Sequence, residues 1–203
     1  TTLALKEILG KAQELNSTHF KNTMALESSD VLEVSSYETK ADLGRIIALL
    51  EASIPELEQT EAHMERVLTE MEQAIKSSTI LSEERKVNVL KSYNEERNDT
   101  TEAVFRRERT KTLIDFYETV LSYYKFLVAN FDDYVIESGE NNERNIAFYT
   151  DANIETANNF LSLINQKSTV FLTADKAWMD YKQSELDESG LNLDTTHTDR
   201  RHH

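Results

Sequence analysis

Apolar residues recur along most of the chain at three- and four-residue spacing, which is the period of an amphipathic helix. The first such stretch covers residues 3–27 and ends before a polar stretch at residues 28–30. We predict one helix there, followed by a second that begins at Asp30 or Ser35, each of which has a Glu three residues later, as in a capping box. The apolar side of the first helix is formed by six positions: Leu5, Ile8, Leu9, Ala12, Leu15 and His19.

The most regular pattern lies in residues 36–77, where ten positions alternate in steps of four and three and nine of them are apolar. A heptad pattern of this length predicts a helix that packs along nearly its whole length against one parallel or antiparallel neighbour, as in a coiled coil. Pro55 lies within it, and because the pattern keeps its register on both sides, we predict a kink there and not a break. The ten positions are Leu43, Ile47, Leu50, Ile54, Leu57, Glu61, Met64, Leu68, Met71 and Ile75.

Residues 82–138 form the next helical stretch, in which the apolar stripe nearly disappears between residues 94 and 101. No Gly or Pro marks this gap, so we predict one continuous helix. The alternative is a break at Asp99, which has Glu102 at capping-box spacing. Beyond the gap, two neighbouring apolar stripes rich in aromatic residues predict a helix that is buried on a wide face and ends at Gly139 as a left-handed C-cap.

A last helix is predicted for residues 143–185, and residues 191–203 lack any periodicity, which predicts a disordered tail. Short connections between long helices make sequential neighbours antiparallel. The pattern therefore predicts an all-α fold, an elongated antiparallel helical bundle or coiled coil of four helices, or five if the third breaks, in one domain over residues 1–190. The buried side of the last helix is predicted to hold Ile146, Tyr149, Phe160, Leu163, Ile164, Val170, Phe171, Ala174, Ala177, Trp178 and Tyr181.

The composition agrees with long helices, because the 203 residues include only 4 Gly and 1 Pro, the residues that most often end helices and strands. Cys is absent, which excludes disulfides, thiolate metal sites and cysteine nucleophiles. No stretch reads as a membrane span, and the first residues lack the apolar run of a signal peptide, so we expect neither.

The net charge is −15, from 22 Lys and Arg against 37 Asp and Glu. This balance argues against nucleic-acid binding, whose affinity comes mainly from Lys and Arg on phosphates. It also argues against direct binding to an anionic membrane through a basic face. An acidic surface favours cationic partners or divalent ions instead.

Glu61 is the one charged residue on the heptad positions of residues 36–77. It could form a buried, paired polar layer, or half of a metal site with His63, because a buried carboxylate needs a partner. We predict a third arrangement, in which the row of heptad positions turns toward solvent at Glu61 and this side chain is partly solvated, since Glu is rarely fully buried. The Glu-x-x-His motif of di-metal bundles is absent. His19, on the apolar side of the first helix, is predicted to be hydrogen-bonded in the core and not a ligand.

Four basic residues form a cluster within residues 102–111, where they could dock an anionic group or an acidic partner surface. We predict instead that they pair with the surplus carboxylates of neighbouring helices, because charged runs on helices usually lie on solvated faces. The cluster consists of Arg106, Arg107, Arg109 and Lys111.

Acidic and aromatic residues gather in the same part of the chain. The acids near Gly139 are predicted to be solvated, with a weak cation site as the alternative; they are Asp132, Asp133, Glu137, Glu140 and Glu143. The aromatics are predicted to be core, with a pocket for a ring-bearing ligand as the alternative; they are Tyr117, Tyr123, Tyr124, Phe126, Phe131 and Tyr134.

The sequence assigns no catalytic, cofactor-binding or metal-binding residue, because it shows no Gly-rich phosphate loop, no Ser-His-Asp order and no nucleophile elbow. We expect a non-enzymatic structural or protein-interaction protein that presents a surface to a protein partner or to a second copy of itself. The alternative is a ligand-binding bundle, such as the sensor or capture domain of an extracytoplasmic protein, with a small molecule in an apolar pocket. A membrane-remodelling protein ranks below these two, and an enzyme ranks last.

Overall fold

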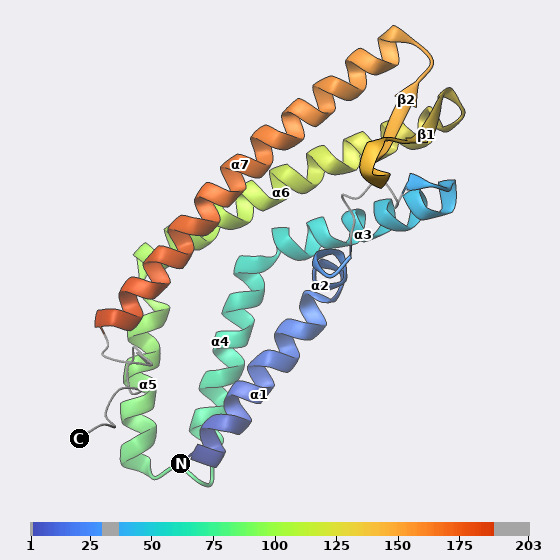
Figure 1. Ribbon diagram of the computed structural model, residues 1–203. Helices are drawn as coiled ribbons and strands as arrows, with labels where there is room; N and C mark the ends of the chain where they lie inside the picture. The colour runs from blue at the N-terminus through green and yellow to red at the C-terminus, as the bar shows by residue number, and fades with distance from the viewer. Residues whose placement is uncertain (1, 30–36, 189–203) are drawn as a thin grey trace, which may run out of the picture.

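The computed structural model describes residues 2–29 and 37–188, and this part of the chain is mostly helical, as the sequence predicts. The longest helices, α6 and α7, lie side by side along most of their length, and a short β-hairpin joins them at one end (Figure 1). The helices are α1 (Thr2–His19), α2 (Lys21–Glu27), α3 (Lys40–Glu58), α4 (Thr60–Ser77), α5 (Glu83–Arg97), α6 (Thr100–Ala129) and α7 (Asp151–Glu188), and the strands are β1 (Tyr134–Ser138) and β2 (Arg144–Phe148). The predicted tail, residues 191–203, lies outside the described residues.

The first predicted helix, residues 3–27, is in fact two helices that meet at Phe20. The free backbone N–H groups at the start of α2 donate to the carboxylate of Glu56 on α3, at 2.8 Å from Asn22 and 3.1 Å from Thr23. A carboxylate at a helix N-terminus satisfies these donors and interacts favourably with the helix dipole. The break is therefore stabilised by a residue that is distant in the sequence.

The second predicted helix, residues 36–77, is also two helices, and the prediction of a continuous, kinked helix is wrong. Pro55 lies inside α3, and the chain changes direction four residues later at Gln59, whose φ of −92° and ψ of 9° are not helical. The hydroxyl of Thr60 donates to the carbonyl of Leu57 at 2.6 Å and so satisfies one of the last carbonyls of α3.

This break divides the heptad positions between different neighbours. The α3 half packs on α2 and α6, whereas the α4 half packs on α1 and α5. The ten positions therefore do not form one seam against one helix. α3 also begins later than predicted, at Lys40, because Thr39 is its N-cap and accepts a hydrogen bond from the N–H of Asp42. The alternative starts, Asp30 and Ser35, lie outside the described residues.

The third predicted helix breaks at Asp99, so the alternative is confirmed and the prediction of one continuous helix is wrong. The carboxylate of Asp99 accepts hydrogen bonds from the N–H groups of Thr101 at 2.9 Å and Glu102 at 3.2 Å, which makes it the N-cap of α6. Because two orphan donors are satisfied in this way, a helix can begin here without Gly or Pro before it.

The predicted helix end at Gly139 and helix start at residue 143 are both wrong, because residues 134–148 contain the two antiparallel strands. The residues with left-handed backbone are Asn141 (φ 66°) and Asn142 (φ 62°), whereas Gly139 has a φ of −84°. Asn tolerates this region better than most residues and so permits the tight turn. β-branched and aromatic residues in the flanking sequence favour strands over a helix.

The buried apolar residues form two clusters. The larger joins α2, α3, α6, α7 and the hairpin, and its most deeply buried members are Leu43, Leu50, Tyr124 and Leu127. The smaller joins α1, α4 and the start of α5 through Ala4, Ile8, Ile75 and Leu81. In the described part of the chain, no helix combines the length and the apolar character that crossing a membrane requires.

Candidate functional site

A cavity of about 620 Å³ lies beside the breaks at Phe20 and Gln59, between α1, α2, α3, α4, α6 and α7. Small-molecule sites in proteins usually measure roughly 300–1,000 Å³ and are mostly apolar. This one, which we call the central cavity, has both properties. Its apolar wall includes Phe20, Met24, Leu57, Met64, Leu113 and Trp178.

Polar residues also line the cavity, and three of them, Thr23, Arg106 and Arg109, matter for what it could bind. Thr23 is 5% exposed, and its hydroxyl has no hydrogen-bond partner among the described residues. Arg106 and Arg109 approach from α6. An unpaired buried hydroxyl costs free energy. A ligand in the cavity that formed a hydrogen bond with Thr23 would remove this cost.

Arg106 is held in place by Glu61 of α4. Its Nε and Nη2 donate to the two carboxylate oxygens at 2.9 and 3.0 Å, which is a bidentate pair. Arg107 adds a contact of 3.5 Å to the same carboxylate. These hydrogen bonds lower the pKa of Glu61 and raise the pKa of Arg106.

Glu61 is thus both partly solvated, as predicted, and paired, with 41% of its side chain exposed. Replacing it with Gln should lower the free energy of unfolding by at most about 1 kcal/mol, because solvent screens a half-exposed ion pair. Chemical denaturation measures the change, and raising the salt concentration should reduce it. Glu58→Gln, at an exposed position with no ion pair in the described part of the chain, is the control. A loss of several kcal/mol would instead indicate a buried charge pair.

His63 and His19 stack on each other, with ring centroids 4.0 Å apart and planes 5° from parallel. His63 is 1% exposed, and its Nε2 hydrogen-bonds to Oδ1 of Asn16 at 2.7 Å. Its Nδ1 has no partner among the residues that the structure describes, and burial lowers its pKa to about 4. Nε2 of His19 donates a hydrogen bond to the carbonyl of Glu56 at 2.9 Å. The predicted hydrogen bonding of His19 is therefore confirmed. Glu61 faces Arg106, so the structure does not bring it together with His63.

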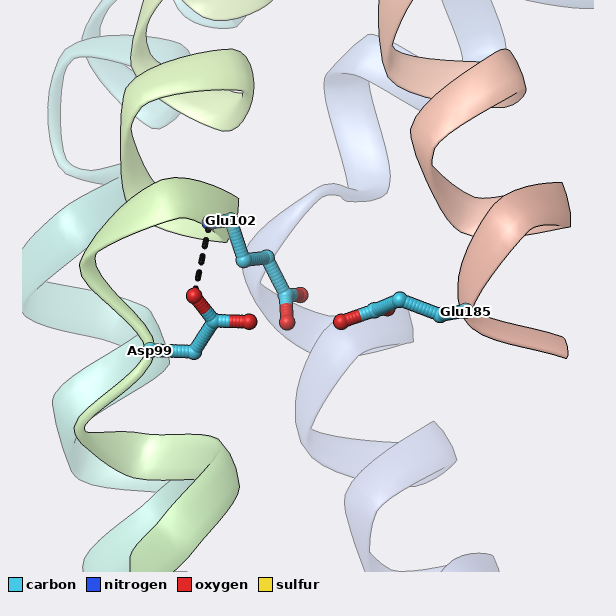
Figure 2. Close-up of side chains that lie close together, drawn as sticks. All are labelled: Asp99, Glu102 and Glu185. Atoms are coloured by element: carbon cyan, nitrogen blue, oxygen red, sulfur yellow. Dashed lines mark hydrogen bonds between the residues drawn. The ribbon is translucent and has the colours of Figure 1, made fainter. Parts of the chain in front are cut away.

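A cluster of three carboxylates lies where α6 begins and α7 ends. Figure 2 shows Asp99, the N-cap of α6, and Glu102 of α6 turned toward Glu185 of α7. Among the described residues, this is a group whose oxygens lie close enough to share a metal ion, within 4.8 Å of one another. This cluster was not predictable from the sequence, because Glu185 is more than 80 residues away from Asp99 and Glu102.

The oxygens of this cluster already have protein partners. The hydroxyl of Tyr181 lies 2.6 Å from Asp99 and 2.9 Å from Glu185, and Nζ of Lys182 donates to Glu102 at 2.7 Å. The hydrogen bond to Asp99 raises the pKa of Tyr181 and lowers that of Asp99. We therefore interpret the cluster as a polar link that fixes the start of α6 to the end of α7.

The predicted basic cluster forms ion pairs within the chain. Besides the contacts to Glu61, Nε of Arg109 donates to Asp175 of α7 at 2.6 Å, and its guanidinium lies 5.5 Å from the centre of the Phe171 ring. The predicted pairing with neighbouring carboxylates is confirmed for Arg106, Arg107 and Arg109, whereas Lys111 forms no ion pair with the described residues. These pairs connect α6 with α4 and α7.

The acidic residues near Gly139 are all exposed around the hairpin, as predicted for solvated side chains. The aromatic residues mostly belong to the core: Tyr117, Tyr123, Tyr124 and Tyr134 are buried in the larger cluster. The hydroxyl groups of Tyr124 and Tyr37 lie 2.8 Å apart. The predicted role of the aromatic stripe as core is therefore confirmed for these four.

One side of α7 exposes a row of large apolar residues. Their spacings of 7, 11, 7 and 7 residues are close to whole numbers of helical turns, so all five lie on one side of the helix. Between 42% and 60% of each residue is exposed. We call this row the α7 flank; it consists of Ile154, Leu161, Leu172, Met179 and Leu186.

The α7 flank continues into a hollow of about 270 Å³ at the hairpin end of the helix. Ile154 and Leu161 form one wall, Ile146 and Phe148 of β2 form another, and Tyr123 lines it from α6. The spacing of these apolar residues was readable in the sequence, but this surface was not predicted.

The sequence analysis also assigned some exposed residues to the buried side of the last helix. Leu163, Val170 and Tyr149 are 40%, 51% and 65% exposed, so that prediction is wrong for them. Tyr149 precedes α7, which begins only at Asp151, so helical periodicity did not apply to it.

The comparisons with known proteins give no relative. The chain matches no model of a protein family, no curated protein and no solved structure. Its function must therefore be inferred from the geometry of these sites.

Proposed function

We propose that the chain is a non-enzymatic protein-interaction module whose α7 flank binds an amphipathic helix of a partner protein. The observation that carries this proposal is the row of five exposed apolar residues at helical spacing, together with the hollow that continues it. Exposed apolar patches commonly mark interaction sites, and these five residues share one side of a single helix. A partner helix would place its own apolar residues against the row at i and i+7.

The charge of the chain indicates what kind of helix fits. With a net charge of −15, two copies of the chain repel each other, whereas a helix with Lys or Arg beside its apolar face is attracted. We therefore propose a basic amphipathic helix as the partner in preference to a second copy. In this proposal the α6–α7 pair belongs to an elongated helical bundle that holds the flank straight.

The non-enzymatic part of the proposal is supported by how the charged groups are used. The bidentate pair of Glu61 with Arg106 and the contacts of Asp99 with Tyr181 connect helices. These groups have roles in holding the fold, which supports a scaffold more than a reacting site.

A fluorescently labelled synthetic helix of Leu and Lys tests the proposal by anisotropy titration. We expect saturable binding that weakens as salt is added, and a Leu172→Glu/Met179→Glu variant should bind at least tenfold more weakly. The matched control is Val87→Glu/Val104→Glu, at positions 65% and 64% exposed on α5 and α6. A helix of Leu and Glu should not bind.

Equal affinity of both variants would remove the α7 flank as the binding site. Light scattering of the peptide-free protein measures its mass and so distinguishes a monomer from a dimer. A mass near 23.4 kDa agrees with a hetero-partner. A dimer that the Leu172→Glu/Met179→Glu variant dissociates would assign the flank to a second copy and overturn the choice of partner.

A further inference from the structure

The central cavity lies apart from the α7 flank and combines an apolar wall with an arginine that has unused donors. Arg109 uses Nε for its hydrogen bond to Asp175. Neither of its Nη atoms makes a hydrogen bond within residues 2–29 and 37–188. The side chain is 34% exposed and lines the cavity, so the end of the guanidinium is open to a ligand.

The charges of the cavity wall favour an anion. Arg106 and Arg109 both line the cavity, whereas their carboxylate partners, Glu61 and Asp175, do not. Glu27 is the acidic residue in the wall, and it is exposed at the end of α2. The wall therefore presents more positive than negative charge, in a chain whose overall charge is strongly negative.

The apolar part of the wall favours a ligand with a substantial hydrocarbon body. Met24, Met64 and Trp178 come from three different helices, and all three are at least partly exposed. Met side chains are flexible and polarisable, so they adapt to ligands of irregular shape. The ring of Trp178 offers a large flat apolar contact.

We propose that the central cavity binds an amphipathic monocarboxylate, a molecule with one carboxylate on an apolar chain or ring. The carboxylate accepts two parallel hydrogen bonds from the Nη atoms of Arg109, which is the geometry that a guanidinium and a carboxylate share. The apolar body lies against Leu57, Leu113 and Trp178. The unpaired hydroxyl of Thr23 lies in the same wall, where a second polar group on the ligand can reach it after rotation about the Cα–Cβ bond.

The net charge of −15 does not prevent this binding. At physiological ionic strength, charges beyond about 8 Å are largely screened, so the nearest groups dominate. Around the cavity these groups are Arg106 and Arg109, each paired with a carboxylate that does not line the wall, and the exposed Glu27. Because the hydrogen bond to Asp175 uses only Nε of Arg109, the N–H donors of its two Nη atoms remain available to a ligand.

Trp178 is the single tryptophan of the chain and lines the cavity, so the fluorescence of the protein reports on the surroundings of this residue. Titration with decanoate should shift or quench this emission with a saturating curve, and isothermal calorimetry should give the same dissociation constant. Decylamine, which has the same apolar chain and the opposite charge, should bind at least tenfold more weakly. Absence of both a fluorescence change and a heat of binding for decanoate would overturn the proposal.

Three variants separate recognition by Arg109 from a structural role of its ion pair. Arg109→Gln should weaken decanoate binding at least tenfold, because a charge-assisted bidentate contact is lost. Asp175→Asn removes the same ion pair but keeps the guanidinium, so decanoate should bind as tightly or more tightly. Arg107→Gln is the matched control, since Arg107 is 66% exposed and does not line the cavity.

Circular dichroism checks that each variant is folded, and Asp175→Asn keeps the test decisive even if Arg109→Gln unfolds. Parallel weakening in Arg109→Gln and Asp175→Asn would show that the ion pair only maintains the cavity, which contradicts the proposal. Equal affinity of Arg109→Gln and the unmodified protein would do the same. These outcomes are independent of the α7 flank, because none of the substituted residues belongs to it.

Discussion

Replacing Leu57 with Ala is expected to lower the free energy of unfolding by about 2–5 kcal/mol, whereas replacing Leu68 with Ala should cost only about 1 kcal/mol. Leu57 is 6% exposed within the larger core, so its truncation leaves a cavity between α3 and its neighbours. Both residues border a cavity, but Leu68 is only partly buried and belongs to neither core cluster, so its truncation removes fewer buried contacts. Solvent or side-chain movement can fill the space that it leaves.

Urea denaturation of the two variants measures this difference, with equal slopes of the transition as evidence that both unfold alike. The pair is informative because both residues occupy heptad positions of residues 36–77, so a single coiled-coil seam would assign them similar costs. Similar losses for both variants would restore that single seam. A much larger loss for Leu57 supports two separate packing environments on either side of Gln59.

The sequence predicted that the chain is mostly helical, because helical periodicity is a local property, but it did not predict most of the helix ends. The break at Asp99 was also readable, since its N-cap partners lie only two and three residues away. The break at Gln59 was predicted as a kink at Pro55 because the heptad pattern keeps its register across it. The break at Phe20 was not readable, because it depends on a tertiary contact. The carboxylate of Glu56 satisfies the start of α2 from another helix, and no pattern within residues 3–27 announces it.

The hairpin was missed for a different reason. The spacing of Tyr134 and Val135 continues the apolar stripes of α6, so periodicity extended the helix through them. Strand propensity and the two consecutive Asn residues, Asn141 and Asn142, gave the opposite signal. The scarcity of Gly and Pro led us to expect few turns, although Asn can adopt the left-handed backbone that this turn requires.

The candidate sites also divide into features that depend on local sequence and features that depend on tertiary contacts. Pairing of Arg106 with a carboxylate was predictable from the excess of acidic residues, but its partner was not. The central cavity draws its wall from six helices, so only the tertiary structure brings Met24, Met64 and Trp178 together. The α7 flank, in contrast, lies on one helix, and its spacing could have been recognised from the sequence.

The stability of the fold should fall as the pH is lowered from about 6.5 toward 4, with a contribution from His63 of about 3 kcal/mol. Burial lowers the pKa of His63 from 6.5 to about 4, and positive charge on His19 and Arg66 adds to this effect. The folded protein therefore favours the neutral ring, and between these two pKa values the unfolded chain binds more protons. The stabilisation is fully present above pH 6.5 and is lost as the pH falls through this window.

A His63→Gln variant isolates this contribution, because Gln can keep a hydrogen bond to Asn16 and does not titrate. The carboxylates that also titrate in acid are common to both proteins, so their effect cancels in the difference. We expect the difference in unfolding free energy between the two proteins to change by about 2–3 kcal/mol from pH 7.5 to 4.5.

NMR titration of the His63 ring should show a midpoint near 4. Parallel stability profiles, or a midpoint near 6.5, would mean that the ring is solvated. His63 hydrogen-bonds to α1, and its stacking partner His19 hydrogen-bonds to α3, so protonation should loosen the contact between the two helix breaks first.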